Sequence, residues 1–231
     1  MRRVENRDTK RNLVFFCVFC LPKGPVIGPL VVAGVTFKDD VKLVDLRLRD
    51  SKKIPSGRRK FLAKKIKDVA SNYEIIVVSA SDIDDMRKVM TLNELEVNVF
   101  SKIINKLKPD VCYVDSADVN EKRFAGEILG RLSFKPYIVS KHKADDVYPI
   151  VSAASILAKT RRDEEVRKIE IILREKLDIP LGSGYPADPV TQKFLRTWVE
   201  RFNELPPYTR HSWETAQKIL LRNKIRKLDE F

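Results

Sequence analysis

Two aspartates stand where apolar strands end, which is a position from which carboxylates can act on a ligand. Asp115 closes the apolar run 111–114, and Asp145 lies in the polar cluster that follows the run 137–139. In open α/β sheets, functional sites form at the carboxyl ends of the strands. An aspartate at the end of a strand is also a common turn former, so a purely structural role stays open.

A glycine and proline turn joins two further apolar runs between residues 13 and 37. The turn is Leu21-Pro22-Lys23-Gly24-Pro25, and the runs on either side have the length and the β-branched and aromatic composition of strands. The pattern predicts a strand, a tight turn and a second strand at the centre of a sheet. The backbone N–H groups of the turn, together with Lys23, would suit a phosphate group, and a plain structural hairpin is the alternative interpretation.

The chain is strongly basic. Its 231 residues include 45 lysines and arginines against 32 aspartates and glutamates, which gives a net charge of +13. Excess positive charge favours a polyanionic partner, with nucleic acid as the first candidate, although basic proteomes and solubility give similar values. Combined with the two aspartates, the charge indicates phosphodiester chemistry with bound magnesium or manganese, because these ions prefer carboxylate oxygens.

The three cysteines, Cys17, Cys20 and Cys112, do not form a disulfide framework. The odd count suits a reducing compartment, so we expect a cytoplasmic protein. Cys17 and Cys20 have C-x-x-C spacing, but no second pair accompanies them and both histidines lie far away in sequence, which argues against a zinc site. The apolar run 13–21 is too short to span a bilayer, and no membrane association is expected.

The remaining hydrophobic pattern predicts helices and strands in alternation. Residues 74–80 predict a third strand, and a helix is expected after Ser56. Further helices are predicted over residues 91–107, 121–132, 148–177 (with a break possible near Lys159), 191–202 and 213–225, with a glycine- and proline-rich loop at 181–186. Three antiparallel strands followed by alternating helices and strands describe an α/β protein with a mixed sheet covered by helices.

Five short motifs occur in order along the chain and point to one family. They are KGPVIGPLVVAG at 23–34, RDSKK at 49–53, YVDSADV at 113–119, KHKADDVYPIVSAASILAK at 141–159 and GSGYPADP at 182–189. Together they resemble ribonuclease HII of the archaeal kind over residues 22–213.

The resemblance implies a ribonuclease H-like α/β fold. It divides the chain into a disordered extension at 1–12, a catalytic domain at 13–180, and a substrate-contacting loop with a helical C-terminal segment at 181–231. It also implies a monomeric endonuclease that hydrolyses the RNA strand of RNA–DNA hybrids and single ribonucleotides within duplex DNA. In the family's reaction, water attacks in line with the help of two Mg²⁺ or Mn²⁺ ions, leaves a 5′-phosphate and a 3′-hydroxyl, and forms no covalent enzyme intermediate.

Carried over position by position, the resemblance assigns roles to individual residues. Asp115 becomes a metal ligand, Asp145 a second carboxylate that binds metal or positions the water, and Tyr185 the side chain that meets the ribose 2′-hydroxyl. Contacts with the substrate are implied for Lys23 and Gly24 of the glycine turn, for Lys52 and Lys53, and, as assisting groups, for Lys143 and Lys159.

The match to the family fails at two adjacent positions. Phe19 and Cys20 stand where the family has an aspartate and a glutamate, so two of four expected carboxylates are absent. A reading-frame slip or sequence error before Gly24 is one hypothesis. The other is a genuine, metal-poor descendant that still binds hybrids and cleaves them far more slowly, or that serves as a noncatalytic nucleic-acid-binding module.

The last residues, KLDEF at 227–231, resemble the tail by which some family members dock to the replication sliding clamp. Ile225 stands where that tail usually has a glutamine. The clamp is therefore a candidate partner in addition to nucleic acid.

Overall fold

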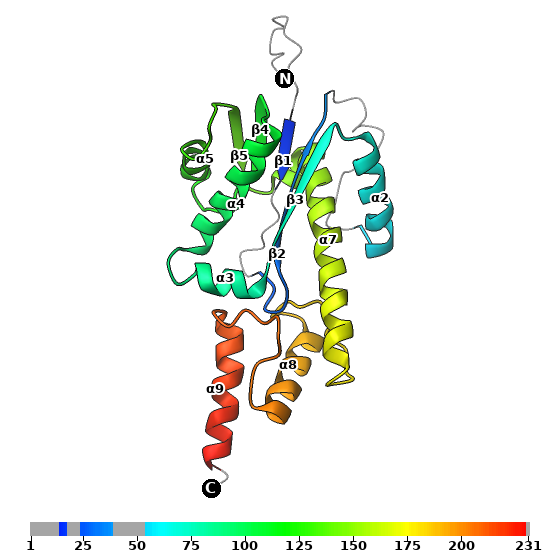
Figure 1. The fold of residues 1–231 in the computed structure, drawn as a ribbon, viewed down its shortest axis with the longest axis vertical. Coiled ribbons are helices and arrows are strands. Elements are labelled where there is room, and N and C mark those ends of the chain that lie inside the picture. The colour runs from blue at the N-terminus through cyan, green and yellow to red at the C-terminus, as the bar shows by residue number, and fades with distance from the viewer. Residues whose placement is uncertain (1–13, 18–23, 39–53, 230–231) are drawn as a thin grey trace, which may run out of the picture.

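The computed structural model describes residues 14–17, 24–38 and 54–229, and Figure 1 shows how their helices and strands are arranged. The strands are β1 (Val14–Cys17), β2 (Leu30–Thr36), β3 (Asn72–Val78), β4 (Val111–Asp115) and β5 (Tyr137–Lys141). The helices are α2 (Ser56–Val69), α3 (Ala80–Met86), α4 (Leu92–Leu107), α5 (Glu121–Leu129), α6 (Ala144–Val147), α7 (Pro149–Arg174), α8 (Pro189–Phe202) and α9 (Glu214–Asp229). This order confirms the predicted α/β class.

The described strands form two hydrogen-bonded sheets, the antiparallel β1-β2-β3 and the parallel β4-β5, which lie next to each other. β2 pairs antiparallel with β1 on one side and with β3 on the other. β4 and β5 pair in parallel, with Asp115 opposite Lys141, and β1 lies alongside β4. Because β4 and β5 run in the same direction, the chain leaves both strands at the same edge of the sheet.

Every residue of β2 is buried because helices cover both of its faces. Successive side chains of a strand point to opposite sides. Val31, Ala33 and Val35 pack with α2 and α7, whereas Leu30 and Val32 pack with α4 and α5. The continuous apolar run that predicted this strand therefore reflects burial on two faces.

The long helix α7 connects the sheet to the C-terminal helices. Its far end carries Val166 and Leu173, which pack with Phe194 and Trp198 of α8 in a third apolar cluster. The break considered near Lys159 does not occur, because this part of the helix consists of small apolar residues packed beneath β2. Neither α7 nor another helix in the described part of the chain is both long and apolar enough to cross a membrane.

Residues 24–29, called the glycine segment below, precede β2; most of the expected turn 21–25 lies outside the described residues. β2 begins only at Leu30, and within the segment Ile27 makes an isolated bridge to Thr209. Gly28 has a φ of +103°, outside the range of a strand. The segment bonds to distant loops, which a local sequence pattern does not reveal.

The hydrophobic periodicity of the sequence does not predict two short helices, α3 and α6. α3 begins with a capping box in which Ser79 and Asp82 exchange hydrogen bonds, and this signal was present in the sequence. α6 is a single turn that begins after Lys143. The polar cluster after β5 is therefore partly helical, which brings Asp145 onto a short helix.

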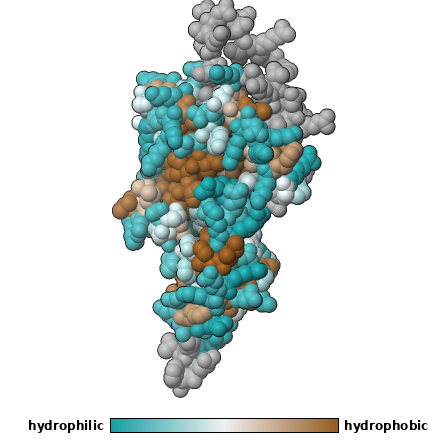
Figure 2. All heavy atoms as spheres, turned by 45° about the vertical axis from the view of Figure 1, so that its right-hand side comes forward, coloured by the Kyte–Doolittle hydropathy of each residue, from teal (hydrophilic) through white to brown (hydrophobic). Residues whose placement is uncertain are grey.

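Hydrophilic residues dominate the face shown in Figure 2, as the high charge predicts. They surround one larger hydrophobic area in the upper part of the molecule and a smaller one below it. The structure also has an apolar groove between β3 and α4, lined by Ile76, Val78, Met86 and Met90 among other residues.

Candidate active site

Asp115 and Asp145 lie at the same edge of the sheet. Asp115 is the last residue of β4, and Asp145 lies in α6, directly after β5. The backbone N–H of Ala144 donates a hydrogen bond of 2.9 Å to Asp115 Oδ1. Asp145 is 2% exposed, and Ser152 Oγ donates to its backbone carbonyl. The structure therefore places the two predicted carboxylates on segments that are directly hydrogen-bonded to each other.

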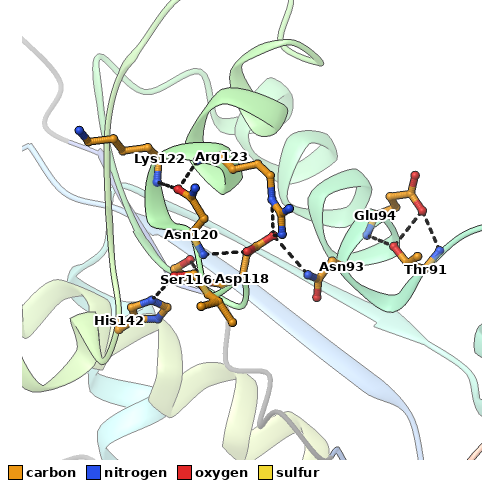
Figure 3. Close-up of polar contacts among 10 residues, drawn as sticks. Thr91, Asn93, Glu94, Ser116, Asp118, Asn120, Lys122, Arg123 and His142 are labelled. Atoms are coloured by element: carbon orange, nitrogen blue, oxygen red, sulfur yellow. Dashed lines mark hydrogen bonds and ion pairs between the residues drawn. The ribbon is translucent and has the colours of Figure 1, made fainter.

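A network of polar contacts fixes the loop that leaves Asp115 (Figure 3). The carboxylate of Asp118, which is 3% exposed, accepts the Asn120 backbone N–H at 2.8 Å and Arg123 Nε at 2.9 Å. Asn93 Nδ2, from α4, donates to the same carboxylate at 3.3 Å. The Asn120 N–H and the Arg123 guanidinium hold the pKa of Asp118 below its ordinary value, so this buried group stays ionised.

Further contacts join this loop to the turn before Asp145. The backbone N–H of His142 donates to Glu121 Oε1 at 2.7 Å, and its ring Nε2 lies 3.2 Å from the Val119 carbonyl oxygen. Lys143 follows with a φ of +52°, in the left-handed region that lysine rarely adopts. The strained turn leaves Lys143 exposed, and the next residue, Ala144, donates its N–H to Asp115.

The glycine segment lies between two loops from the C-terminal part of the chain. The N–H groups of Val26 and Ile27 both donate to the Gly184 carbonyl, at 2.8 and 3.2 Å, and the Gly28 N–H donates to the Tyr208 carbonyl at 3.0 Å. Gly184 has a φ of +80°, and a Cβ at this position would lie 2.7 Å from the Ile27 carbonyl oxygen. Only glycine fits this approach of two backbones.

Arg210 anchors the glycine segment from inside the protein. Its side chain is fully buried, its backbone N–H donates to the Val26 carbonyl at 2.8 Å, and its Nε donates to the Gly28 carbonyl at 3.0 Å. The guanidinium lies over the Trp213 ring, 4.7 Å from the ring centroid. A Cβ on Gly24 would approach Arg210 Nη1 to 2.8 Å, so glycine at this position leaves room for the buried cation.

A small pocket of about 30 Å³ opens where the glycine segment, α7 and the loop before α8 meet. Its lining includes Gly24, Lys159, Arg162, Tyr185 and Arg210. A space of this size holds one or two water-sized groups. The pocket therefore admits a hydroxyl rather than a whole nucleotide, and it brings together three of the residues predicted to bind substrate.

Five of the predicted positions lie outside the described residues: Phe19, Cys20, Lys23, Lys52 and Lys53.

Sequence reasoning missed two residues of the pocket. Arg162 lies three residues after Lys159 on α7, and this helical spacing was the only available signal for it. Arg210 lies in the loop before α9, and its burial against the glycine segment depends on contacts between residues 182 positions apart in the chain. No local pattern marks such a residue.

The described carboxylates fit one divalent ion. Asp115 and Asp145 offer hard oxygen donors, and Mg²⁺ commonly uses one or two carboxylates together with waters and substrate phosphates. Within the described ranges, no three His, Cys, Asp or Glu side chains come together in a group that could hold a metal. A pair of ions held by four carboxylates has no counterpart in this part of the chain.

The amino-acid sequence matches a family of known proteins over most of its length. The family model described as Ribonuclease HII matches residues 22–216. The Ribonuclease HII of Methanococcoides burtonii is 43% identical over 206 residues, which cover 86% of this chain and 95% of that protein. The Ribonuclease HII of Thermococcus kodakarensis is 46% identical over 201 residues and covers 85% of each chain.

Solved structures show the same arrangement of elements. The ribonuclease H2 of Pyrococcus horikoshii OT3 superposes with a TM-score of 0.81 at 39% identity, covering 92% of this chain and 99% of that one. The RNase HII in a PCNA:RNase HII complex from Archaeoglobus fulgidus superposes with a TM-score of 0.78 at 37% identity, covering 90% and 95%. Bst-RNase HIII, at 19% identity and a TM-score of 0.74, shares the fold.

Proposed function

Because the chain belongs to the ribonuclease HII family and is thus a type 2 ribonuclease H, we propose that it cuts the RNA strand of RNA–DNA hybrids and of duplex DNA that contains single ribonucleotides. The observation that carries this proposal is the pocket shared by Gly24, Lys159 and Tyr185. Water attacks the phosphate in line and leaves a 5′-phosphate and a 3′-hydroxyl. The enzyme acts as a cytoplasmic monomer.

Tyr185 is the proposed reader of the ribose. A phenol combines an apolar ring with a hydrogen-bonding tip, and the 2′-hydroxyl is the group that distinguishes RNA from DNA. Tyr185 lines a pocket with room for a hydroxyl, beside the backbone of Gly24. A deoxyribose would leave the phenol without that partner, which disfavours DNA at this position.

The lysines are the proposed contacts to the substrate phosphates. Lys159 lines the pocket, and Lys143 stands exposed beside the acidic pair. A cation at each place would offset charge on the phosphates that flank the ribonucleotide. For Lys23, Lys52 and Lys53 the same role rests on the sequence motifs alone.

Asp115 and Asp145 are the proposed ligands of Mg²⁺ or Mn²⁺. When bound, the ion supplies activation of water and neutralises charge that develops on the phosphate. The protein's own contribution is orientation. The Ala144 N–H holds Asp115 Oδ1, and the hydrogen bonds of Asp118 hold the loop behind it. Supporting contacts of this kind fix a ligand before the substrate arrives.

Phe19 and Cys20 favour a second candidate function, a hybrid-binding protein with impaired catalysis. These residues replace two carboxylates of the family pattern, and the two carboxylates of the described site fit a single ion. The loss of a two-ion clamp removes stabilisation from both the attacking and the leaving oxygen.

One experiment separates the two functions. A labelled duplex with a single ribonucleotide is incubated with the protein and with Mg²⁺ or Mn²⁺ in parallel. Rapid formation of a cut product supports the endonuclease, whereas a mobility shift with little or no product supports the hybrid-binding protein. The absence of both a shift and a product contradicts both functions.

The C-terminal tail 227–231 is the proposed docking segment for a sliding clamp. The Archaeoglobus fulgidus relative was solved in a complex with PCNA, and in this chain α9 extends to Asp229, so the first residues of the tail belong to this helix. Deletion of residues 227–231 should abolish binding of the clamp while leaving affinity for the hybrid within about twofold. Unchanged clamp affinity in the truncated protein would exclude this role for the tail.

A further inference from the structure

A cation lies directly over the aromatic ring that we assign to ribose recognition. The guanidinium carbon of Arg162 is 4.7 Å from the centroid of the Tyr185 ring, within the range of a cation–π contact. Arg162 belongs to α7, whereas Tyr185 belongs to the loop between α7 and α8. Both residues line the pocket described above. The contact therefore links a helix of the main body to the loop that carries the aromatic side chain.

Glycines stand close to Tyr185 within its loop. Gly182 and Gly184 flank the position closely, with φ values of +79° and +80°. Asp188 fixes the loop backbone, because its Oδ2 accepts the Ser183 N–H at 2.7 Å. The orientation of the ring itself depends on what packs against its face.

Arg162 is held by Asp163, which pairs in turn with a second arginine. Its Nε donates to Asp163 Oδ1 at 3.1 Å, and its Nη2 bonds to the same oxygen. Asp163 Oδ2 pairs in turn with Arg59 Nη1 of α2 at 3.4 Å. The side chains of all three residues are only 18–19% exposed. Because a guanidinium is planar and offers a rigid fork of donors, this arrangement presents a fixed face to Tyr185.

We propose that Arg162 is a positioning residue for ribose selection, which fixes the Tyr185 ring at the mouth of the pocket so that its hydroxyl meets a 2′-hydroxyl. The inference rests on the proposed role of Tyr185. Selection of one hydroxyl requires a donor held within a fraction of an ångström, and a ring that rotates freely loses that selectivity. A lysine at position 162 would keep the charge but offer no flat face, so Arg162→Lys removes the positioning function and retains the attraction to phosphate.

The test measures binding selectivity without cleavage. In buffer free of divalent metal, the full-length protein is titrated with a duplex containing one ribonucleotide and with the identical all-deoxyribonucleotide duplex. We expect Arg162→Lys to reduce the ratio of the two affinities about fivefold, while affinity for the all-deoxyribonucleotide duplex stays near that of the wild type. Arg161→Lys is the matched control, because it makes the same change at the preceding residue, and it should keep the wild-type ratio.

A double-mutant cycle shows whether Arg162 acts through the ring. In the Tyr185→Ala background, Arg162→Lys should cause no further loss of selectivity. If the loss is the same in both backgrounds, Arg162 acts on the substrate directly and the proposal is wrong. A wild-type ratio in Arg162→Lys also overturns it.

Two further variants test the support of Arg162 and separate its role from that of Tyr185. Asp163→Asn leaves Arg162 in place but removes the carboxylate that holds it, and it should lower the ratio in the same direction; an unchanged ratio in a folded Asp163→Asn protein argues against the proposal. If Tyr185→Ala has the same ratio as the wild type, the ribose-reading role of Tyr185 fails, and the inference fails with it. A loss in Tyr185→Ala but not in Arg162→Lys defeats the inference alone.

Discussion

The backbone N–H of Ala144 donates a 2.9 Å hydrogen bond to Asp115 Oδ1, so the end of β4 and the turn that carries Asp145 form one unit. An ionised carboxylate has about four acceptor sites, and this bond occupies one of them. The bond comes from the backbone, and it orients the carboxylate whatever side chain occupies position 144. The backbone contact between β4 and α6 thus holds together the two segments that carry Asp115 and Asp145.

Replacement of Asp115 by asparagine should abolish metal-dependent cleavage but spare hybrid binding. The amide keeps an acceptor for the Ala144 N–H and loses the negative charge that attracts a divalent ion. We expect the single-turnover cleavage rate to fall by at least about 100-fold, and Asp145→Asn to behave in the same way. Asp146→Asn is the matched control because Asp146 is the exposed neighbour of the pair. A comparable loss in the control would show that local charge, rather than these two carboxylates, supports the reaction.

Restoring the family's acidic residues should raise activity strongly. Phe19→Asp combined with Cys20→Glu returns two hard oxygen ligands to the sequence, and we expect cleavage with Mg²⁺ or Mn²⁺ to increase by at least about 100-fold. Phe19→Asn with Cys20→Gln supplies nearly the same volume without charge and should give no such gain. Equal activity of the wild type and the acidic double variant would show that these positions do not serve as ligands.

Much of the fold followed from periodicity and capping in the sequence. The apolar intervals of α4 predicted its position, and the structure begins this helix after a capping box formed by Thr91 and Glu94. The apolar run that contains β2 predicted a strand at the centre of a sheet, and the structure shows that helices contact both faces of this strand. Local signals of this kind fail for the glycine segment, because its hydrogen bonds go to Gly184 and Tyr208, far away in the chain.

Residues of the candidate site are predictable from the sequence where they belong to a short motif. Strand ends and family motifs predict Asp115 and Asp145, and the structure places both at one edge because β4 and β5 are parallel. No sequence pattern singles out Arg162 or Arg210 as a site residue, because many arginines are expected in a chain of net charge +13. Their roles depend on burial and on ring contacts, which exist only after the loops have packed together.

Gly184→Ala should destabilise the protein and weaken hybrid binding together. The substitution forces a side chain into a left-handed conformation and against the Ile27 carbonyl oxygen, 2.7 Å from the new Cβ. Strain of this kind costs about 1–3 kcal/mol in the free energy of unfolding, measured by urea denaturation. Because Gly184 bonds the glycine segment, we also expect the affinity for hybrid to fall by about tenfold.

The matched control for this substitution is Gly126→Ala in α5. A Cβ at Gly126 meets nothing within 4 Å, and alanine favours a helix over glycine by about 1 kcal/mol. This variant should therefore be as stable as the wild type or slightly more stable, with unchanged hybrid affinity. If Gly184→Ala behaved like Gly126→Ala, the close approach of the two backbones would not be a requirement of the fold.

Asp118→Asn should remove an acid-sensitive part of the stability. The Asn120 N–H and the Arg123 guanidinium lower the pKa of Asp118 in the folded protein. In the unfolded chain an aspartate has a pKa of about 3.9. A group with a lowered folded pKa contributes stability that is present above the unfolded pKa and disappears as the pH falls through the folded pKa. The free energy of unfolding of the wild type should therefore fall on acidification below about pH 4, and more steeply than that of Asp118→Asn.

At neutral pH we expect Asp118→Asn to lower the free energy of unfolding by about 1–3 kcal/mol, because it weakens hydrogen bonds between charged groups at a buried carboxylate. Asp85→Asn is the matched control. Asp85 pairs with Lys88 at 2.7 Å, but both side chains are more than 70% exposed and solvent screens the pair, so this substitution should change the free energy of unfolding much less. Urea denaturation of the three proteins between pH 2.5 and pH 7, roughly the range on either side of the unfolded pKa, provides the measurement. An Asp118→Asn protein with the wild-type dependence on pH would show that the contacts in Figure 3 do not stabilise the charged form of Asp118.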